Sequence, residues 1–312
     1  MLIAFDGREL VRGRVTGIAR FLSGLVEALA SDEAVEEVIL AVTRKENVSK
    51  SLIRLKTVIL KTVPDSFLGA EIALSNLTKQ GIDCFISPYP KLPLFGTHCP
   101  SVHTVHDVLD LTHRAYQKRY RSFWDTYRLK KALARADLTW FDSSFSRQET
   151  EALVGFSGRN PRVRHLGLNP RFSPECIKNE DAVLAGYGLD SGYVLVIGNG
   201  LPNKNLGVLL QISGSLKRSL VCAGVSDDHQ AFWTSMCPEA EAIWVSHVQE
   251  EDLPAILRNA FCLAQPSTAE GYGYPPLEAM ACGVPAVISD ISVLIETTGG
   301  CALTADPSDA ER

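Results

Sequence analysis

The chain has 312 residues, of which 46% are hydrophobic and 21% charged, and its formal net charge is -5 at pH 7. This composition argues against a disordered chain and against a nucleic-acid binder that relies on a broad basic face. The length exceeds the size at which one hydrophobic core usually stops growing, so two domains are expected. The eight cysteines form no CxxC pair and no zinc-ligand spacing, and are expected to be reduced thiols.

The first half of the sequence alternates short apolar runs with helical stretches. Strands are expected at 2–5, 38–42, 84–87 and 101–105, with a helix at 17–30. Alternation of this kind is typical of a parallel sheet with helices on both faces. Residues 166–190 mix proline, glycine and polar residues, as an interdomain connection would. We therefore expect a Rossmann-like N-terminal domain over residues 1–170.

The same rhythm restarts in the second half. Strands are expected at 193–197, 219–223, 242–245, 262–265 and 286–288, and helices at 207–214, 254–258 and 276–281. A second doubly wound, Rossmann-like domain is therefore expected over residues 171–312. The fold class is α/β, and neither half contains a short-period repeat or a low-complexity segment.

The segment from Glu270 to Pro285 predicts a glycine-containing loop, a short helix, a turn and a strand. Gly271 and Gly273 allow the backbone to approach a ligand closely. The expected helix start near Pro276 offers free N–H groups and the positive end of a helix dipole, which suit a phosphate. Glu278 is expected in the first turn, where its carboxylate can accept two hydrogen bonds from a ribose diol.

The end of this helix is expected at Gly283, a C′ glycine, with Pro285 preventing its continuation. A Gly/Pro-rich turn before a short helix is also common in proteins without a ligand there. In that interpretation Glu278 only favours the helix dipole. Spacing alone leaves the two interpretations about equally weighted.

The two glutamates separated by seven residues, followed by Ala-Met-Ala-Cys-Gly-Val-Pro-Ala-Val, resemble the E-x7-E motif of a known family. This is the large retaining GT-B glycosyltransferase family often numbered four, the glycosyl transferases group 1. The resemblance implies two facing Rossmann-like domains with a cleft between them. It gives Glu270 a positioning and electrostatic role on the sugar side. The implied donor-binding residues of this segment are Gly271, Tyr272, Gly273, Tyr274 and Glu278.

The stretch from Val196 to Asn205 also resembles this family, in a strand-to-helix segment that ends in Lys-Asn or Lys-Gly. In the family that lysine neutralises the donor diphosphate, so Lys204 takes this role here. Its charge should matter most as charge builds on the leaving diphosphate. Many members have an arginine five or six residues earlier, where this chain has Asn199. The alternative is that Lys204 is a solvated lysine of a polar loop.

The sequence from Arg14 to Phe21 resembles the family's loop that enters the first helix opposite the donor. The resemblance implies that Gly17 brings backbone N–H groups towards phosphate or sugar. Ala19 departs from the pattern, because relatives commonly have a second glycine there. An ordinary helix start capped by Thr16 is compatible with both interpretations.

The run Val102-His103-Thr-Val-His106-Asp107 resembles the family's His-Asp pair at the end of a strand. His106 is the residue implied to approach the transferred sugar, with His103 and Asp107 in support. A lone histidine is more often a hydrogen-bonded packing residue, but ligands of open sheets bind at the carboxyl ends of parallel strands. Ser143-Ser144 resembles the serine that follows the last strand of the first domain and caps the next helix.

Residues 114–135 carry eight basic residues against one acid, interleaved with five aromatic ones. Such a helix suits an anionic membrane surface or a lipid-diphosphate acceptor. The alternative is a surface helix whose aromatic residues pack inward. The start of the sequence lacks signal-peptide character, and no apolar run reaches the roughly 18 residues of a membrane span. We expect a cytoplasmic protein, peripheral to the inner face of the membrane if this helix binds lipid.

The resulting hypothesis is a retaining glycosyltransferase, with catalytic residues His106, Lys204 and Glu270. The donor is a nucleoside diphosphate sugar, GDP-mannose or a UDP-sugar. The acceptor is a saccharide or a lipid-linked saccharide in cell-surface polysaccharide or lipopolysaccharide assembly. No cofactor is expected, and no metal, because the chain lacks an Asp-x-Asp motif that would hold magnesium between phosphates.

Three alternatives stay open at this point. Relatives usually continue beyond the Asp306-Pro307 region, so a shortened second domain is expected, and the chain could be a truncated or non-catalytic nucleotide-sugar binder. A second alternative is another GT-B enzyme, such as a sugar-nucleotide epimerase. The third is an NAD-dependent dehydrogenase, which has little support because residues 7–17 contain no G-x-G-x-x-G.

Overall fold

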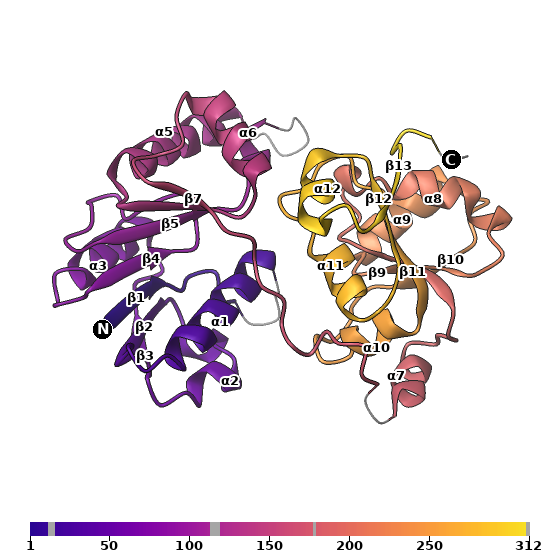
Figure 1. Ribbon diagram of the computed structural model, residues 1–312, viewed down its shortest axis with the longest axis horizontal. Coiled ribbons are helices and arrows are strands. Elements are labelled where there is room, and N and C mark those ends of the chain that lie inside the picture. Colours follow the sequence, from indigo (N-terminus) through magenta and orange to yellow (C-terminus); the bar gives the residue numbers. More distant parts are fainter. Residues whose placement is uncertain (12–15, 113–118, 177–178, 310–312) are drawn as a thin grey trace. The chain divides into compact units, whose positions relative to one another are not determined.

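The computed structural model describes residues 1–11, 16–112, 119–176 and 179–309. The chain divides into two compact units, Met1–Gly167 and Leu168–Arg312 (Figure 1). Each unit is built on its own parallel sheet flanked by helices, so the expected α/β class is confirmed. No helix within the described ranges is long and apolar enough to cross a membrane.

The first unit has seven strands in the order β3-β2-β1-β4-β5-β6-β7. The strands are β1 Leu2–Asp6, β2 Glu37–Val42, β3 Val58–Thr62, β4 Cys84–Ser87, β5 Ser101–Val105, β6 Leu138–Phe141 and β7 Pro161–Val163. The α-helices are α1 Gly17–Ala30, α2 Lys50–Ile53, α3 Phe67–Leu77, α4 Leu109–Thr112, α5 Arg119–Arg135 and α6 Ser144–Val154, and Lys45–Asn47 form a 3-10 turn. The sequence order of the strands reverses between β1 and β4.

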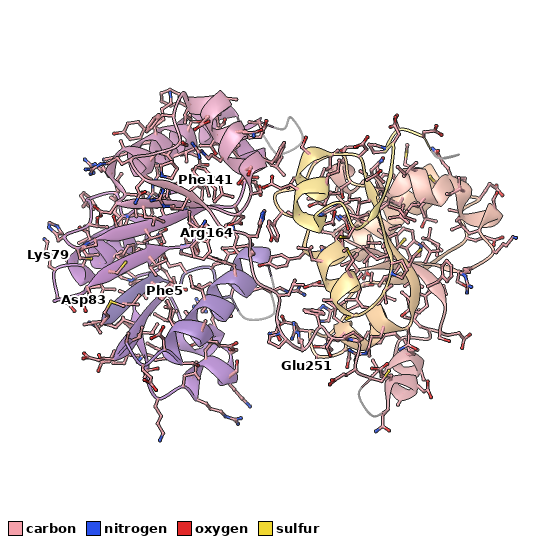
Figure 2. The ribbon with its side chains drawn as sticks, viewed as in Figure 1. Phe5, Lys79, Asp83, Phe141, Arg164 and Glu251 are labelled. Atoms are coloured by element: carbon pink, nitrogen blue, oxygen red, sulfur yellow. The ribbon has the colours of Figure 1, made fainter. Side chains whose placement is uncertain are left out.

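The central strand β1 is buried because both faces of the sheet are covered. Phe5 pairs in register with Leu40 of β2 and Ile86 of β4. It belongs to the hydrophobic cluster that includes Leu22 of α1, whereas its neighbour Ala4 belongs to the cluster on the other face, with α3. Phe5 and Phe141 of β6 are among the largest fully buried side chains (Figure 2). This double coverage explains why the strands are near-continuous apolar runs.

The second unit has six strands in the order β10-β9-β8-β11-β12-β13. The strands are β8 Tyr193–Ile197, β9 Leu220–Ala223, β10 Ala242–Val245, β11 Ala260–Gln265, β12 Ala286–Ser289 and β13 Leu303–Ala305. The α-helices are α7 Glu180–Gly186, α8 Leu206–Ile212, α9 Asp227–Met236, α10 Leu253–Arg258, α11 Tyr274–Ala281 and α12 Ser292–Thr298, with 3-10 turns at Pro202–Lys204 and Ser213–Ser215. Here the sequence order reverses between β8 and β11.

Two details of the chain organisation differ from expectation. The strand before Ser143 is not the last of its unit, because β7 follows α6 and pairs with β6. This edge strand is only three residues long and begins with Pro161, so it has no apolar run to reveal it. The stretch expected to be an irregular connection, 166–190, contains the helix α7, whose Leu184 packs into the hydrophobic core of the second unit.

Candidate functional site

The predicted donor residues of the second unit lie where the strand order of its sheet reverses, whereas Gly17 lies in the first unit, at the start of α1. Ligands of open α/β sheets bind outside the carboxyl ends of the strands at such a point. The strands on either side of the reversal are β8 and β11. The loop that carries Lys204 follows β8, and the loop that carries Glu270 follows β11. The fold therefore brings together two segments that lie 66 residues apart in sequence.

The loop after β8 is shaped by two glycines. Gly198 donates its N–H to the carbonyl of Ala223 at 3.0 Å, and a Cβ at this position would lie 3.2 Å from Cγ of Lys204. The stem of Lys204 therefore lies directly against the Gly198 backbone. Gly200 has a φ of +78°, and a Cβ there would lie 2.7 Å from Cβ of His229. A side chain is excluded at this turn both by conformation and by contact.

Lys204 and Glu270, both predicted to be catalytic, form an ion pair. The Lys204 Nζ lies 2.7 Å from Glu270 Oε1, and the two side chains are 18% and 9% exposed. Gln265 Nε2 and Ser267 Oγ donate to the same oxygen, each at 2.6 Å. No described residue donates to Oε2 of Glu270. That oxygen can accept a ligand hydroxyl, and the ammonium group keeps donors for an anion.

Two asparagines tie the loops of β8 and β11 to each other. Asn203 Nδ2 donates to the carbonyl of Ala269 at 3.0 Å, and the Thr268 N–H donates to the Asn203 carbonyl at 2.8 Å. Asn205 has a left-handed φ of +52°, and its Nδ2 donates to the carbonyl of Pro266 at 3.0 Å. These bonds fix Lys204, which lies between the two asparagines, against the Glu270 loop.

The helix α11 begins at Tyr274, two residues before the expected start near Pro276. The expectation that Glu278 lies in the first turn is therefore wrong: it lies beyond that turn and is 2% exposed. The two prolines did not mark the start, because every position of the first turn tolerates a residue without an N–H group. Of the first three helical residues only Tyr274 has an N–H group, since Pro275 and Pro276 have none.

Gly273 is the N-cap of α11 and has no room for a side chain. Its φ is +88°, and a Cβ there would lie 2.4 Å from Cδ2 of the buried Leu294. Tyr272, 7% exposed, packs edge-on against Tyr274 with ring centroids 5.3 Å apart. At the other end Gly283 adopts a φ of +78°, as expected of a C′ glycine.

Asn199 is exposed at the position where relatives were expected to have an arginine. Its Oδ1 accepts a hydrogen bond of 3.2 Å from the N–H of Leu201, two residues on. The side chain therefore shapes its own loop, as asparagine commonly does in turns. It brings a polar group to this end of β8 but no charge.

In the first unit, His106 follows β5 and is held from three sides. Its Nδ1 bonds the carboxylate of Asp142, its Nε2 lies 3.1 Å from the Pro88 carbonyl, and its ring packs edge-on against Phe21 at 5.0 Å. Because a carbonyl oxygen only accepts, Nε2 carries a proton. Burial favours the neutral ring, but the charge and hydrogen bond of Asp142 outweigh burial and raise the pKa of His106.

The other two residues of the His-Asp segment, His103 and Asp107, form hydrogen bonds with neighbouring elements. His103 is fully buried, with Nε2 2.9 Å from Thr139 Oγ1, and burial lowers its pKa to about 3, so the ring stays neutral. Asp107 Oδ1 accepts from the Leu109 N–H at 2.9 Å, at the start of α4. The charge of Asp107 also raises the pKa of His106.

Two serine or threonine caps occur where the sequence indicated them. Thr16 Oγ1 accepts from the Ala19 N–H at 3.1 Å, so α1 begins at Gly17 with an ordinary side-chain cap. Ser143 forms a capping box with Ser146 at the start of α6. Arg14, which was part of the resemblance at the first helix, lies outside the described residues.

The basic segment 114–135 is only partly described, because 114–118 and the side chains of 119–121 lie outside the described residues. In α5 the aromatic residues Phe123, Trp124 and Tyr127 are 80%, 41% and 46% exposed. The alternative in which the aromatic residues pack inward is therefore wrong for these three. Arg128, by contrast, is buried and does not belong to a solvated cationic face.

Three further residues of the site were missed by sequence reasoning. Asp142 holds His106, and Gln265 and Ser267 hold Glu270. A signal existed for two of them, because Asp142 directly follows β6 and Gln265 ends β11. A polar residue at the carboxyl end of a parallel strand is placed beside the residues that follow the neighbouring strands.

The match to a known family model lies within the second unit. Residues 186–310 match the family model described as glycosyl transferases group 1. O-antigen chain mannosyltransferase B of Escherichia coli is 31% identical over 226 residues, which are 68% of this chain and 58% of that protein. O-antigen chain mannosyltransferase RfbU of Salmonella typhimurium is 30% identical over 125 residues, 38% of this chain and 35% of that protein.

Among solved structures, Anabaena Alr3699/HepE in complex with UDP superposes with a TM-score of 0.73. The alignment covers 99% of this chain and 86% of that structure, at 16% sequence identity. At that identity the likeness concerns the fold, and it agrees with two Rossmann-like units of the GT-B class. The chain spans less than two thirds of the length of both curated relatives.

Proposed function

Because the chain belongs to the glycosyl transferases group 1 family, we propose that it is a retaining glycosyltransferase that uses a nucleoside diphosphate sugar. The observation that best supports this proposal is the ion pair of Lys204 and Glu270 at the reversal of the second sheet. It sets a cation and a carboxylate side by side, next to the N-terminal end of α11. A diphosphate and a sugar hydroxyl need those two kinds of group.

In this proposal the second unit, residues 168–312, binds the donor. Lys204 and the N–H groups at the start of α11 bind the diphosphate, where charge develops as the sugar leaves. Glu270 accepts a sugar hydroxyl through Oε2, and Glu278 accepts from the ribose diol. Asn199 belongs to the loop after β8, and the backbone of Gly271 to Tyr274 follows β11.

The transfer step exchanges one bond to the anomeric carbon for another. The bond to the donor phosphate breaks, and its electron pair stays on the phosphate oxygen. The acceptor hydroxyl bonds to the same face of the carbon, and its proton passes to that phosphate oxygen. Glu270 then serves to position the sugar and stabilise charge, without forming a covalent intermediate. The first unit, residues 1–167, holds the acceptor, with His106 close to the transferred sugar and Gly17 near phosphate or sugar.

GDP-mannose is the first donor to test, because both curated relatives are named mannosyltransferases. A UDP-sugar is the second, because the Anabaena structure holds UDP. The names of the relatives refer to O-antigen chains, so we propose a saccharide or lipid-linked saccharide acceptor of cell-surface polysaccharide. The exposed aromatic residues Phe123, Trp124 and Tyr127 support contact of α5 with a membrane surface, peripheral to its cytoplasmic face.

Release of nucleotide from each donor, with a lipid-linked saccharide extract as acceptor, tests the activity. We expect GDP or UDP release that depends on the extract and yields a product with the donor's anomeric configuration. An epimerase would alter the donor sugar without any acceptor. A non-catalytic binder would bind the donor and release nothing, and a dehydrogenase would bind NAD instead. Any of these three results contradicts the proposal.

A further inference from the structure

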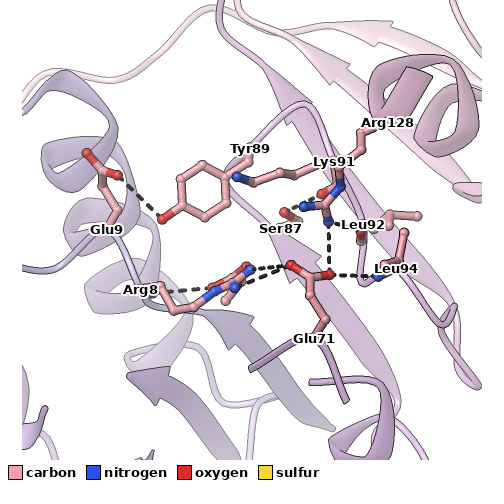
Figure 3. Close-up of polar contacts among 10 residues, drawn as sticks. Arg8, Glu9, Glu71, Ser87, Tyr89, Lys91, Leu92, Leu94 and Arg128 are labelled. Atoms are coloured by element: carbon pink, nitrogen blue, oxygen red, sulfur yellow. Dashed lines mark hydrogen bonds and ion pairs between the residues drawn. The ribbon is translucent and has the colours of Figure 1, made fainter. Parts of the chain in front are cut away.

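The sheet of the first unit reverses its strand order between β1 and β4, and a group of charged residues lies there (Figure 3). This is the position at which open sheets bind ligands. The group is made of Asp6, Arg8 and Glu9 at the end of β1, Tyr89 and Lys91 after β4, Glu71 of α3 and Arg128 of α5. Its members differ in whether their charges are already neutralised by a partner.

Both arginines of the group are paired. Arg8 contacts Asp6 at 2.7 Å and Glu71 at 3.3 Å, and Arg128 contacts Glu71 at 2.9 Å. Arg128 also donates to the carbonyl of Leu92, and Glu71 accepts from the N–H of Leu94 at 2.7 Å. Two guanidinium groups and two carboxylates thus form a closed, buried network. It leaves neither carboxylate for another cation.

Lys91 is the remaining cation, and no described residue forms an ion pair or a hydrogen bond with its ammonium group. Its recorded contact is with the ring of Tyr89, 4.8 Å from Nζ to the centroid (Figure 3). Burial, with the charge of Arg128, lowers the pKa of Lys91. A cation–π contact offsets only part of the cost of removing an unpaired ammonium group from water. A bound anion would offset that cost.

The loop after β1 fixes the ring of Tyr89, and the ammonium group of Lys91 lies over that ring. Its hydroxyl lies 3.4 Å from Glu9 Oε2, and Glu9 Oε1 accepts from the hydroxyl of Thr16 at 2.7 Å. Thr16 is the N-cap of α1, so the ring is linked to the start of a helix. The Glu9 carboxylate is thereby engaged with two hydroxyl groups and is held on the far side of the ring from the arginine network (Figure 3).

The loop that carries Lys91 also contacts His106. The carbonyl of Pro88, three residues before Lys91, is the partner of His106 Nε2. The same loop therefore carries Lys91 and holds the residue that we assign to the transferred sugar.

We propose that Lys91, supported by Tyr89, binds an anionic group of the acceptor, a phosphate or a carboxylate. That the anion belongs to the acceptor rests on the proposed function, whereas anion binding at Lys91 does not. The two sources of such a group are the phosphate of a lipid-linked saccharide and the carboxylate of an acidic sugar. Lys91 would select acceptors that carry one of them close to the reacting hydroxyl.

Calorimetric titration of the full chain with inorganic pyrophosphate, inorganic phosphate and glucuronate tests the proposal. The variants are Lys91→Gln, Lys91→Arg and the exposed control Lys79→Gln, at a residue whose ammonium group contacts Asn76, outside the network. We expect Lys91→Gln to weaken one class of anion sites at least about tenfold, as for the loss of a charge-assisted hydrogen bond. Lys91→Arg should retain the site and Lys79→Gln should not affect it. Preference for the phosphates or for glucuronate identifies the source.

Titration of the same proteins with GDP-mannose and with UDP-glucose separates this proposal from the proposed function. If neither nucleotide sugar binds but anion binding still depends on Lys91, the donor assignment is wrong and the anion site stands. If anion affinity is the same in Lys91→Gln and wild type, the anion site is refuted. Should Lys91→Gln not fold, Lys91→Met decides, because it keeps most of the side-chain length and removes the charge. Anion affinity in Lys91→Met equal to that of the wild type contradicts the proposal.

Discussion

Both nitrogens of His106 are occupied by oxygen acceptors, which sets the chemistry available to this residue. The pair with Asp142 raises the pKa of the ring, and Nε2–H can donate to a sugar or phosphate oxygen in place of the Pro88 carbonyl. A nitrogen that carries a proton is a hydrogen-bond donor and not a base. We infer that Asp142 positions His106 for that role.

The pair of His106 and Asp142 predicts a dependence of stability on pH. The pKa of His106 is raised in the folded chain, so the group contributes its full stability below the unfolded value of 6.5. That contribution is lost as pH rises through the folded pKa. Replacing the carboxylate in Asp142→Asn should lower the pKa of His106. Below pH 6.5 the variant should lower the free energy of unfolding by about 1–3 kcal/mol.

Urea unfolding of wild type and Asp142→Asn across this pH range, with NMR titration of the His106 ring, measures both effects. We expect the stability difference to shrink as pH rises. Asp190→Asn, at an exposed residue for which the described part of the chain shows no hydrogen bond or ion pair, is a control for the loss of one carboxylate. A His106 pKa that does not change in Asp142→Asn would refute the positioning role.

Lys204 predicts a kinetic effect. The variant Lys204→Ala removes the cation expected at the leaving diphosphate and should lower kcat by about 10²–10³, a typical loss for a group that stabilises developing charge. The Kd for donor should change less. Steady-state kinetics checks this, with the exposed Lys217→Ala as control. A loss confined to KM would mean that Lys204 binds ground state and transition state equally.

At the scale of elements, the start of α11 depends on Gly273. Alanine at this position would have to adopt a φ of +88° and would collide with Leu294. We expect Gly273→Ala to displace the N-terminal end of α11 and to destabilise the chain by about 1–3 kcal/mol. Because the diphosphate is assigned to that end, donor affinity should fall as well.

The matched control for Gly273→Ala is Gly299→Ala. Gly299 also has a positive φ, +61°, but a Cβ there meets nothing within 4 Å. It should cost stability without changing donor affinity. Urea unfolding and donor titration of both variants check this. Donor affinity unchanged in Gly273→Ala would separate α11 from the donor site.

Comparison of elements shows what the sequence could predict. The strands of both sheet centres were predicted within one or two residues, because strands buried on both faces are apolar runs: β1, β5 and β8 are examples. The edge strands β3 and β7 were not predicted, because they are short or only partly buried. The start of α11 was misplaced, since prolines in a first turn do not fix its beginning.

Sequence motifs identified individual residues of the site, and the strand order of the sheets determined which other residues contact them. Glu270 and Lys204 were predicted as separate site residues, but their direct ion pair follows from the adjacency of β8 and β11. The network that leaves Lys91 unpaired joins β1, α3, β4 and α5, which no local pattern links. Which residues pair across these elements could therefore not be predicted from the sequence.

For the whole molecule, the account predicts membrane association through the first unit. The double variant Phe123→Ser/Trp124→Ser should reduce binding to anionic phospholipid vesicles about tenfold or more, because each exposed ring would otherwise insert at the interface. Phe232→Ser, at an exposed aromatic residue of the second unit, is the control. Sedimentation with vesicles at low and high salt measures this, and equal sedimentation of all variants would contradict it.

The central claim is that the loops after β8 and β11 bind a nucleoside diphosphate sugar. Calorimetric titration of GDP-mannose, UDP-glucose, UDP-N-acetylglucosamine and NAD into wild type, Glu278→Ala and Glu270→Gln tests it most directly. The account predicts that one nucleotide sugar binds the wild type, that Glu278→Ala weakens both the nucleotide sugar and its free nucleotide, and that Glu270→Gln weakens only the nucleotide sugar. Equal affinities in all three proteins, or binding of NAD alone, would contradict it.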